Sequence, residues 1–213
     1  MKLSNFFLDS MHQICQESRE GNFLSNVPRT VDGVVLKSHD ERDEDCVITF
    51  QTESVIEKFL LKFEDLRMDC NDHLYIYDGA HVAGHWRVRF CTQDQYFIAL
   101  LQAHISCDSR PSSVGSQGFI ITRSNFVTLR YHTDSWGSQN NGFTLVITAF
   151  KNSRTFGCSS GFSCDSQICI SNDLKCDGVH HCGHGQDEEA THCSGECIYN
   201  IKPTCKIVSV VRG

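Results

Sequence analysis

The sequence predicts a mainly β protein: an antiparallel two-sheet sandwich followed by a small, disulfide-rich module dominated by loops. Short runs of alternating apolar and polar residues fill residues 46–151, and clusters of Gly, Asn, Asp and Ser separate them. Such runs are typical of strands with one buried face, and several of them in succession favour a sandwich. Six cysteines then crowd residues 158–193, which are too few to build a core of their own.

Composition narrows the class of protein further. The chain has 213 residues, enough for one or two domains, and its thirteen cysteines indicate an oxidising compartment. The net charge is −7 and no basic run is present, which argues against nucleic acid as a partner. No apolar stretch approaches the roughly 20 residues that span a bilayer, so no membrane span is expected within this chain.

The two ends of the chain carry weak signals. Residues 1–30 are polar and are expected to be irregular, and residues 194–213 form a tail that is possibly truncated. Met1–Leu8 begins like a secretory signal, but its apolar part is too short. The cysteines nevertheless predict an extracellular location, either secreted or in the ectodomain of a single-pass membrane protein. A signal upstream, or a longer product, would reconcile the two observations.

The alternating segments are assigned to strands by their period of two. The apolar positions that share one face within a run are Phe59, Leu61 and Phe63; Leu74 and Ile76; Val127, Leu129 and Tyr131; and Phe143, Leu145, Ile147 and Ala149. Tyr96–His104 is apolar nearly all round and could be a strand or a short helix. The acidic run at residues 38–46 is interpreted as a solvated turn.

Four strings within this region resemble a CUB domain, with the resemblance covering residues 31–151. They are Asp45-Cys-Val-Ile-Thr-Phe50, Asp69-Cys-Asn-Asp-His-Leu-Tyr-Ile-Tyr-Asp-Gly79, Arg89-Phe-Cys91, and Val127-Thr-Leu-Arg-Tyr-His-Thr-Asp-Ser-Trp-Gly-Ser-Gln-Asn-Asn-Gly-Phe143. The resemblance implies a two-sheet sandwich with bridges Cys70–Cys91 and Cys15–Cys46. Residues 152–157 would then be a linker.

The chain departs from the CUB pattern by an insert at about residues 96–118, which carries Cys107. A long insert in a compact domain is usually functional or disordered. It is either an ordered flap followed by a floppy loop, or a loop that binds a partner. Cys107 has no obvious partner for a bridge, because Cys197 and Cys205 are expected to pair with each other.

Many CUB domains hold calcium, and the resemblance places two ligands at Asp72 and Asp134. Asp69 is the third candidate, with Glu64 as its alternative. Carboxylates that converge repel one another unless a cation neutralises them, although each of these residues could instead cap a turn. His132 and Trp136 flank this edge and are candidate ligand-binding residues that could pack on the stem of a partner's Lys or Arg.

A second resemblance covers residues 158–193, which are similar to the LDL-receptor class A repeat. The strings that carry it are Gly161-Phe-Ser-Cys164, Gln167-Ile-Cys169-Ile-Ser171, Leu174-Lys-Cys-Asp-Gly178 and Cys182-Gly-His-Gly-Gln-Asp-Glu188. Spacing alone allows 15 connectivities among six cysteines. The family pairing, carried over to this chain, implies Cys158–Cys169, Cys164–Cys182 and Cys176–Cys193.

The calcium cage of this repeat looks incomplete. Asp177, Asp187 and Glu188 match three carboxylate ligands, whereas His181 stands where a fourth is expected. An imidazole is a poor ligand for a hard cation, so calcium binding is expected to be weak or absent. Clustered histidines also suggest zinc, but the nearby cysteines are better used as bridges.

No catalytic motif is present, so the chain is not expected to be an enzyme. We expect non-catalytic extracellular modules of a receptor or co-receptor, with the neuropilin- and tolloid-like type of architecture, that bind a protein ligand presenting Lys or Arg. The alternative is a regulatory, non-catalytic segment of a modular serine protease, because Cys205-Lys-Ile-Val208 resembles a zymogen cleavage point. A transmembrane helix after Gly213 would favour the first reading, and a protease domain the second.

Overall fold

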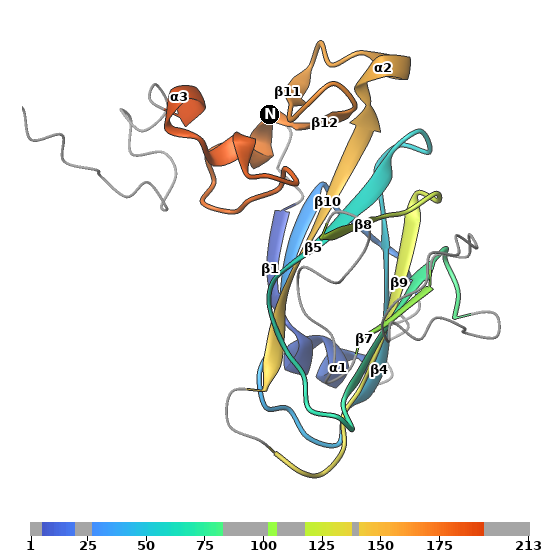
Figure 1. The fold of residues 1–213 in the computed structure, drawn as a ribbon. Coiled ribbons are helices and arrows are strands. Elements are labelled where there is room, and N and C mark those ends of the chain that lie inside the picture. Colours follow the sequence, from blue (N-terminus) through green and yellow to red (C-terminus); the bar gives the residue numbers. More distant parts are fainter. Residues whose placement is uncertain (1–5, 20–26, 83–101, 106–117, 138–140, 194–213) are drawn as a thin grey trace, which may run out of the picture. The chain divides into compact units, whose positions relative to one another are not determined.

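The computed structural model describes residues 6–19, 27–82, 102–105, 118–137 and 141–193 (Figure 1). The chain divides into two compact units, Met1–Phe150 and Lys151–Gly213. The first unit is a β-sandwich, and the second is a small module with little regular structure. The insert expected at residues 96–118 lies mostly outside the described residues.

Two sheets form the layers of the first unit (Figure 1). One sheet has the strand order β1 (Phe6–Ser10), β3 (Gly33–Ser38), β10 (Gly142–Asn152), β5 (Lys58–Arg67) and β8 (Phe119–Ile121). The other has the order β2 (Arg29–Thr30), β4 (Asp45–Gln51), β9 (Phe126–His132), β6 (His73–Asp78) and β7 (Gln102–Ile105). The predicted mainly β, two-sheet fold is therefore confirmed.

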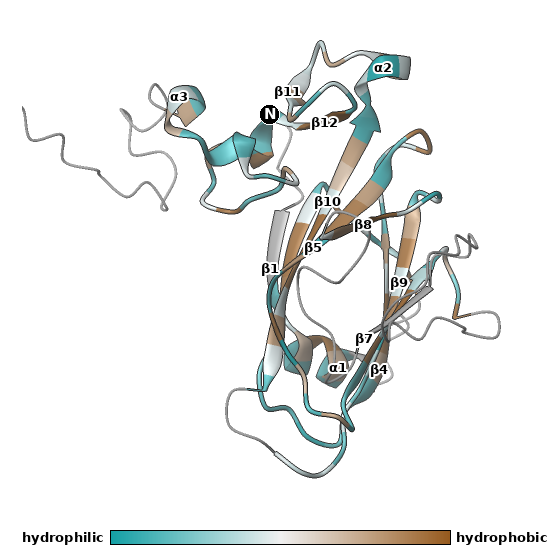
Figure 2. Ribbon diagram, in the orientation of Figure 1, coloured by the Kyte–Doolittle hydropathy of each residue, from teal (hydrophilic) through white to brown (hydrophobic). Residues whose placement is uncertain are grey.

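The alternation in sequence places one face of each strand in a common core. Figure 2 shows hydrophobic residues on β5, β9 and β10, and the buried cluster draws on both sheets. Tyr131 of β9 packs edge-to-face on Phe143 of β10 at 5.7 Å between ring centroids, and Phe143 packs in the same way on Phe63 of β5 at 6.0 Å. Aromatic pairs prefer this geometry, so these rings join the two layers.

The N-terminal segment corrects one expectation. Residues 1–30 are not irregular throughout, because they contain β1, the helix α1 (Met11–Arg19) and β2. Met11, Ile14 and Cys15 follow the i, i+3, i+4 spacing of one helical face, and all three are buried. β1 pairs with β3 and β2 with β4 in parallel, so the sheets are mixed rather than wholly antiparallel.

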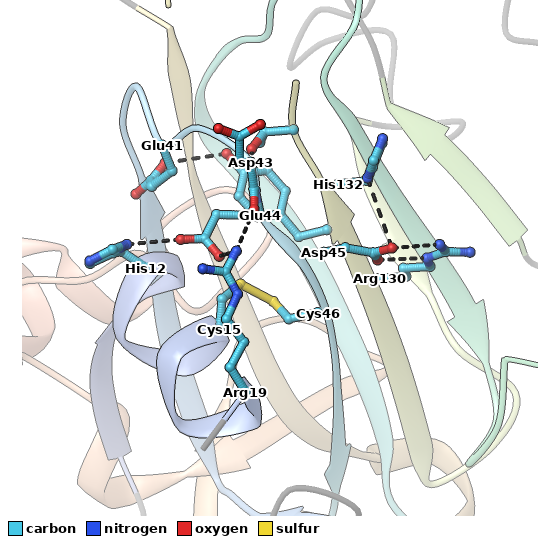
Figure 3. The surroundings of a disulfide bond; sticks show 12 residues. His12, Cys15, Arg19, Glu41, Asp43, Glu44, Asp45, Cys46, Arg130 and His132 are labelled. Carbon is cyan, nitrogen blue, oxygen red and sulfur yellow. Dashed lines mark hydrogen bonds and ion pairs between the residues drawn. A yellow bond between two sulfur atoms is a disulfide. The ribbon is translucent and has the colours of Figure 1, made fainter. Parts of the chain in front are cut away.

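α1 is held to the sandwich by a bridge and by a buried carboxylate (Figure 3). Cys15 of α1 is bonded to Cys46 of β4. Beside this bridge, Glu44 is 2% exposed, with His12 Nδ1 at 2.9 Å from its Oε1 and Arg19 Nη2 at 2.8 Å from its Oε2. A buried charge is tolerated when it is paired, and here both of its partners come from α1.

The second unit consists of short elements and bridges. α2 (Ser153–Phe156) lies in the segment expected to be a linker, and the hairpin β11 (Gly161–Ser163) and β12 (Ile168–Ser171) is antiparallel. The turns η3 (Asn172–Leu174) and η4 (Gln186–Glu188) and the helix α3 (Ala190–Cys193) follow. Its disulfides are Cys158–Cys169, Cys164–Cys182 and Cys176–Cys193, the same pairs that the class A resemblance implies.

Candidate cation and ligand sites

The first candidate site is an acidic cluster at one end of the sandwich. Asp72 immediately precedes β6, and Asp134 follows β9 by two residues. The antiparallel register pairs His73 with His132, so the two carboxylates are brought to the same end of neighbouring strands. Asp72 is 1% exposed, and its Oδ1 accepts the Asp134 backbone N–H at 3.1 Å. The Asp72 N–H in turn donates to the Asp69 carbonyl at 3.2 Å.

Asn141, which sequence reasoning did not single out, links the members of this cluster. Its Nδ2 donates to Asp72 Oδ2 at 2.6 Å, and its Oδ1 accepts the Asp69 backbone N–H at 2.9 Å. The only signal in the sequence was its place just before Gly142, at the start of β10. Gly142 has φ +133°, and a Cβ there would lie 2.3 Å from the Ser38 carbonyl oxygen. No side chain is therefore tolerated at Gly142, where β10 begins close against Ser38.

The cluster carries unfavourable electrostatics. Burial is the main cause that raises the pKa of Asp72 above its ordinary 3.8, and the charges of Asp134 and Asp69 raise it further. The hydrogen bonds from Asn141 and Asp134 lower the same pKa, so they offset part of this effect. Glu64, the alternative to Asp69, is exposed on β5. Among the described residues, no group of three or more His, Cys, Asp or Glu is arranged to hold a metal ion.

Exposed side chains surround the acidic cluster. Trp136 is 77% exposed, and its backbone N–H donates to Asp134 Oδ1 at 2.8 Å. The His132 ring stacks on that of His73 with centroids 6.4 Å apart, and its Nδ1 lies 4.0 Å from Asp45 Oδ2. Arg130 holds Asp45 through two bonds, and these lower the pKa of that carboxyl. Both predicted ligand-binding residues, His132 and Trp136, therefore stand at this edge.

The second candidate site is the carboxylate cage of the second unit. Asp187 is fully buried, and its two oxygens accept the backbone N–H groups of Cys182 at 3.1 Å and His181 at 2.7 Å. Glu188 follows it on η4 and accepts the N–H groups of Asp177 at 2.9 Å and Gly178 at 3.0 Å. Burial raises the pKa of Glu188, and the charges of Asp177 and Asp187 add to that shift.

His181 lies inside this cage. Its side chain is 0% exposed, and its Nε2 lies 3.2 Å from Asp177 Oδ2. An ionised carboxylate only accepts hydrogen bonds, so Nε2 carries the proton in this contact. Asp177 Oδ1 accepts the Val179 N–H at 2.9 Å. Calcium binds six to eight oxygen ligands, whereas here an imidazole nitrogen contacts one of the three carboxylates, so the donors do not match a calcium cage.

Of the bridges predicted outside the class A repeat, only Cys15–Cys46 joins two residues that the structure describes. The first unit contains the Cys15–Cys46 bridge implied by the CUB resemblance. Cys70 is disulfide-bonded, but its expected partner Cys91 is not among the described residues. Cys107, Cys197 and Cys205 also lie outside them.

No described helix has the length and apolar character needed to cross a membrane.

Comparisons with known proteins give likenesses for both units. The chain is 26% identical over 175 residues to Neuropilin and tolloid-like protein 2 of Mus musculus, covering 76% of this chain and 28% of that relative. It is 38% identical over 64 residues to Abnormal cell migration protein 13 of Caenorhabditis elegans, covering 30% of this chain and 18% of the relative. The chain therefore spans less than two thirds of these relatives.

Solved structures with a likeness include the CUB1-EGF-CUB2 domain of human MASP-1/3, at 21% identity and a TM-score of 0.37, covering 59% of this chain and 42% of that one. The family model of the low-density lipoprotein receptor domain class A matches residues 157–193. Those residues contain the three bridges and the His181 cage described above. Residues 157–193 of this chain are therefore a low-density lipoprotein receptor domain class A.

Proposed function

We propose that the chain is a pair of non-catalytic extracellular binding modules from a receptor or co-receptor. In this proposal the first unit is a CUB-type domain that captures a basic side chain of a protein ligand. The observation that carries it is the acidic cluster of Asp69, Asp72 and Asp134 beside the exposed ring of Trp136. The disulfides, the class A domain and the likeness to Neuropilin and tolloid-like proteins support an extracellular setting.

The proposed site works by charge and by packing. Asp69, Asp72 and Asp134 are not arranged as a metal site among the described residues, but a calcium ion that drew them together would neutralise their mutual repulsion beside the loop after β9. The backbone already fixes this loop from two sides, because Asp43 N–H donates to the Asp134 carbonyl at 2.8 Å and Trp136 N–H to its carboxylate. Carboxylate oxygens that face outward form charge-assisted hydrogen bonds to a lysine or arginine, while Trp136 covers its aliphatic stem.

The Asp134→Ala variant tests the capture of a basic side chain. A lysine-rich peptide, titrated calorimetrically into the full chain with calcium present, should bind about tenfold or more weakly to the variant, because a hydrogen bond to a charged group contributes about 1.5–3 kcal/mol. Glu53→Ala is the matched control, because this exposed carboxylate follows the far end of β4. Unchanged binding by Asp134→Ala would favour the rival site in the 96–118 insert and end the proposal.

The raised pKa of Asp72 predicts an unusual pH dependence. A raised pKa means that this carboxyl stabilises the fold below pH 3.8, its ordinary pKa, and that the contribution is lost as pH rises through the raised value. Calcium requires the ionised form, so its affinity should begin to fall at a higher pH than for an ordinary aspartate. Calcium titrations between pH 7 and pH 4 check this expectation, and a calcium affinity that stays flat until pH 4 contradicts it.

A further inference from the structure

We infer that the class A domain closes its carboxylate cage with its own histidine, so that residues 158–193 fold and keep their bridges without calcium. The inference concerns the second unit alone and does not depend on the ligand capture proposed for the first. It starts from the mismatch between the donors of the cage and a hard cation.

One residue ties both sides of the cage. The backbone N–H of His181 donates to Asp187 Oδ2 at 2.7 Å, and its ring Nε2 donates to Asp177 Oδ2 at 3.2 Å. The ring is completely buried, and its Nε2 engages the Asp177 Oδ2 atom that a cation in the cage would use. A cation at the same place would have to displace the ring.

The carboxylates are also fully engaged by the chain. Each of the six oxygens of Asp177, Asp187 and Glu188 accepts a hydrogen bond from an N–H group of the same domain. Calcium would therefore have to compete with these hydrogen bonds for the carboxylate oxygens, most directly with the His181 ring at Asp177 Oδ2.

The covalent frame holds this arrangement in place. Cys182 follows His181, is fully buried and is bonded to Cys164, while Cys176 N–H donates to the Asp187 carbonyl at 3.2 Å. The turn between His181 and Asp187 closes through a bond from Gly185 N–H to the Cys182 carbonyl at 3.1 Å. Gly185 has φ +75°, and a Cβ there would lie 3.2 Å from the His180 ring. These contacts fix the backbone that carries His181 and Asp187.

The test measures amide hydrogen exchange at residues 181–188 of the full chain, with calcium and with a chelator. Protection in the natural chain should be the same in both conditions, and the three bridges should form in equal yield during oxidative refolding with the chelator. His181→Asp should gain a calcium dependence of at least tenfold in protection, because it restores a fourth carboxylate. The readout is local, so a cation bound by the first unit does not affect it.

A second variant keeps the test decisive if His181→Asp fails to fold. His181→Gln retains a polar group but shortens the reach to Asp177, so residues 181–188 should exchange several-fold faster and remain insensitive to calcium. Protection equal to that of the natural chain would show that the ring does not close the cage. Loss of protection or of correct bridges in the natural chain under chelator would equally overturn the inference, as would a gain of protection with calcium.

Discussion

An Asp187→Ala variant is expected to lose the native pairing of the class A domain. Asp187 is fully buried, and its side chain accepts the N–H groups of His181 and Cys182. Removing it leaves two buried donors without their acceptor, at about 1–3 kcal/mol each. A domain of this size holds only a few kcal/mol of stability from its core, so the loss is comparable with the whole.

The measurement is the yield of the three native bridges after oxidative refolding of the full chain, mapped on non-reduced peptides. Asp173→Ala is the matched control, because Asp173 is an exposed carboxylate in the same domain. The control should refold in normal yield, and Asp187→Asn should fall between the two because it keeps one side-chain oxygen as an acceptor. Native bridges at full yield in Asp187→Ala would mean that the carboxylate does not organise the loop.

Strands were predicted from alternating apolar residues where those residues are in fact buried in the core. Val127, Leu129 and Tyr131 alternate along β9 and are all buried, as are Leu145 and Ile147 of β10. The cysteine pairs could not follow from spacing, because six cysteines allow many connectivities, and they came from the family resemblance. The alternating pattern thus predicted long strands of the first unit, and the resemblance predicted the three bridges of the second.

The N-terminal elements escaped prediction for a physical reason. β1 joins the edge of its sheet through backbone hydrogen bonds to β3. Such bonds can be made by almost any residue, so they leave no pattern of side chains that a sequence analysis could recognise. α1 shows only three buried apolar positions among polar residues. Its stability comes from tertiary contacts to residues more than twenty positions away, and a local reading does not contain them.

Candidate residues of both sites could be named from the sequence, but the hydrogen bonds that connect them could not. The CUB resemblance placed Asp72 and Asp134 at one edge of the sandwich, yet the bridging amide of Asn141 arises only when β10 begins beside β5. His181 was identified as a departure from a carboxylate set. That its backbone and its ring bind two different carboxylates is a matter of three-dimensional geometry.

The Cys15–Cys46 bridge supplies the second large effect. Replacing both cysteines by alanine should destabilise the first unit by about 3–4 kcal/mol, the loop-closure entropy for a sequence separation of 31. The bridge joins α1 to β4 at the point where Glu44 contacts His12 and Arg19 (Figure 3). Without it, the polar ties of α1 to the sandwich would be mainly ion pairs, those of His12 and Arg19 with Glu44 and that of Glu17 with Arg29.

The two pairs at Glu44 are not surface pairs, because Glu44 is buried, so removing Arg19 would itself be destabilising and would not isolate the effect of the bridge. Urea unfolding of the full chain, followed by hydrogen exchange in β4 and β9, should therefore show a large loss of stability in the double cysteine variant and a loss of at most about 1 kcal/mol in Arg67→Ala, which removes only an exposed ion pair with Asp65. Protease should also cut α1 in the double variant well below its unfolding midpoint, because the helix detaches before the sheets separate. If the two variants were equally stable, burial of Met11 and Ile14 rather than the covalent bond would be what holds α1 in place.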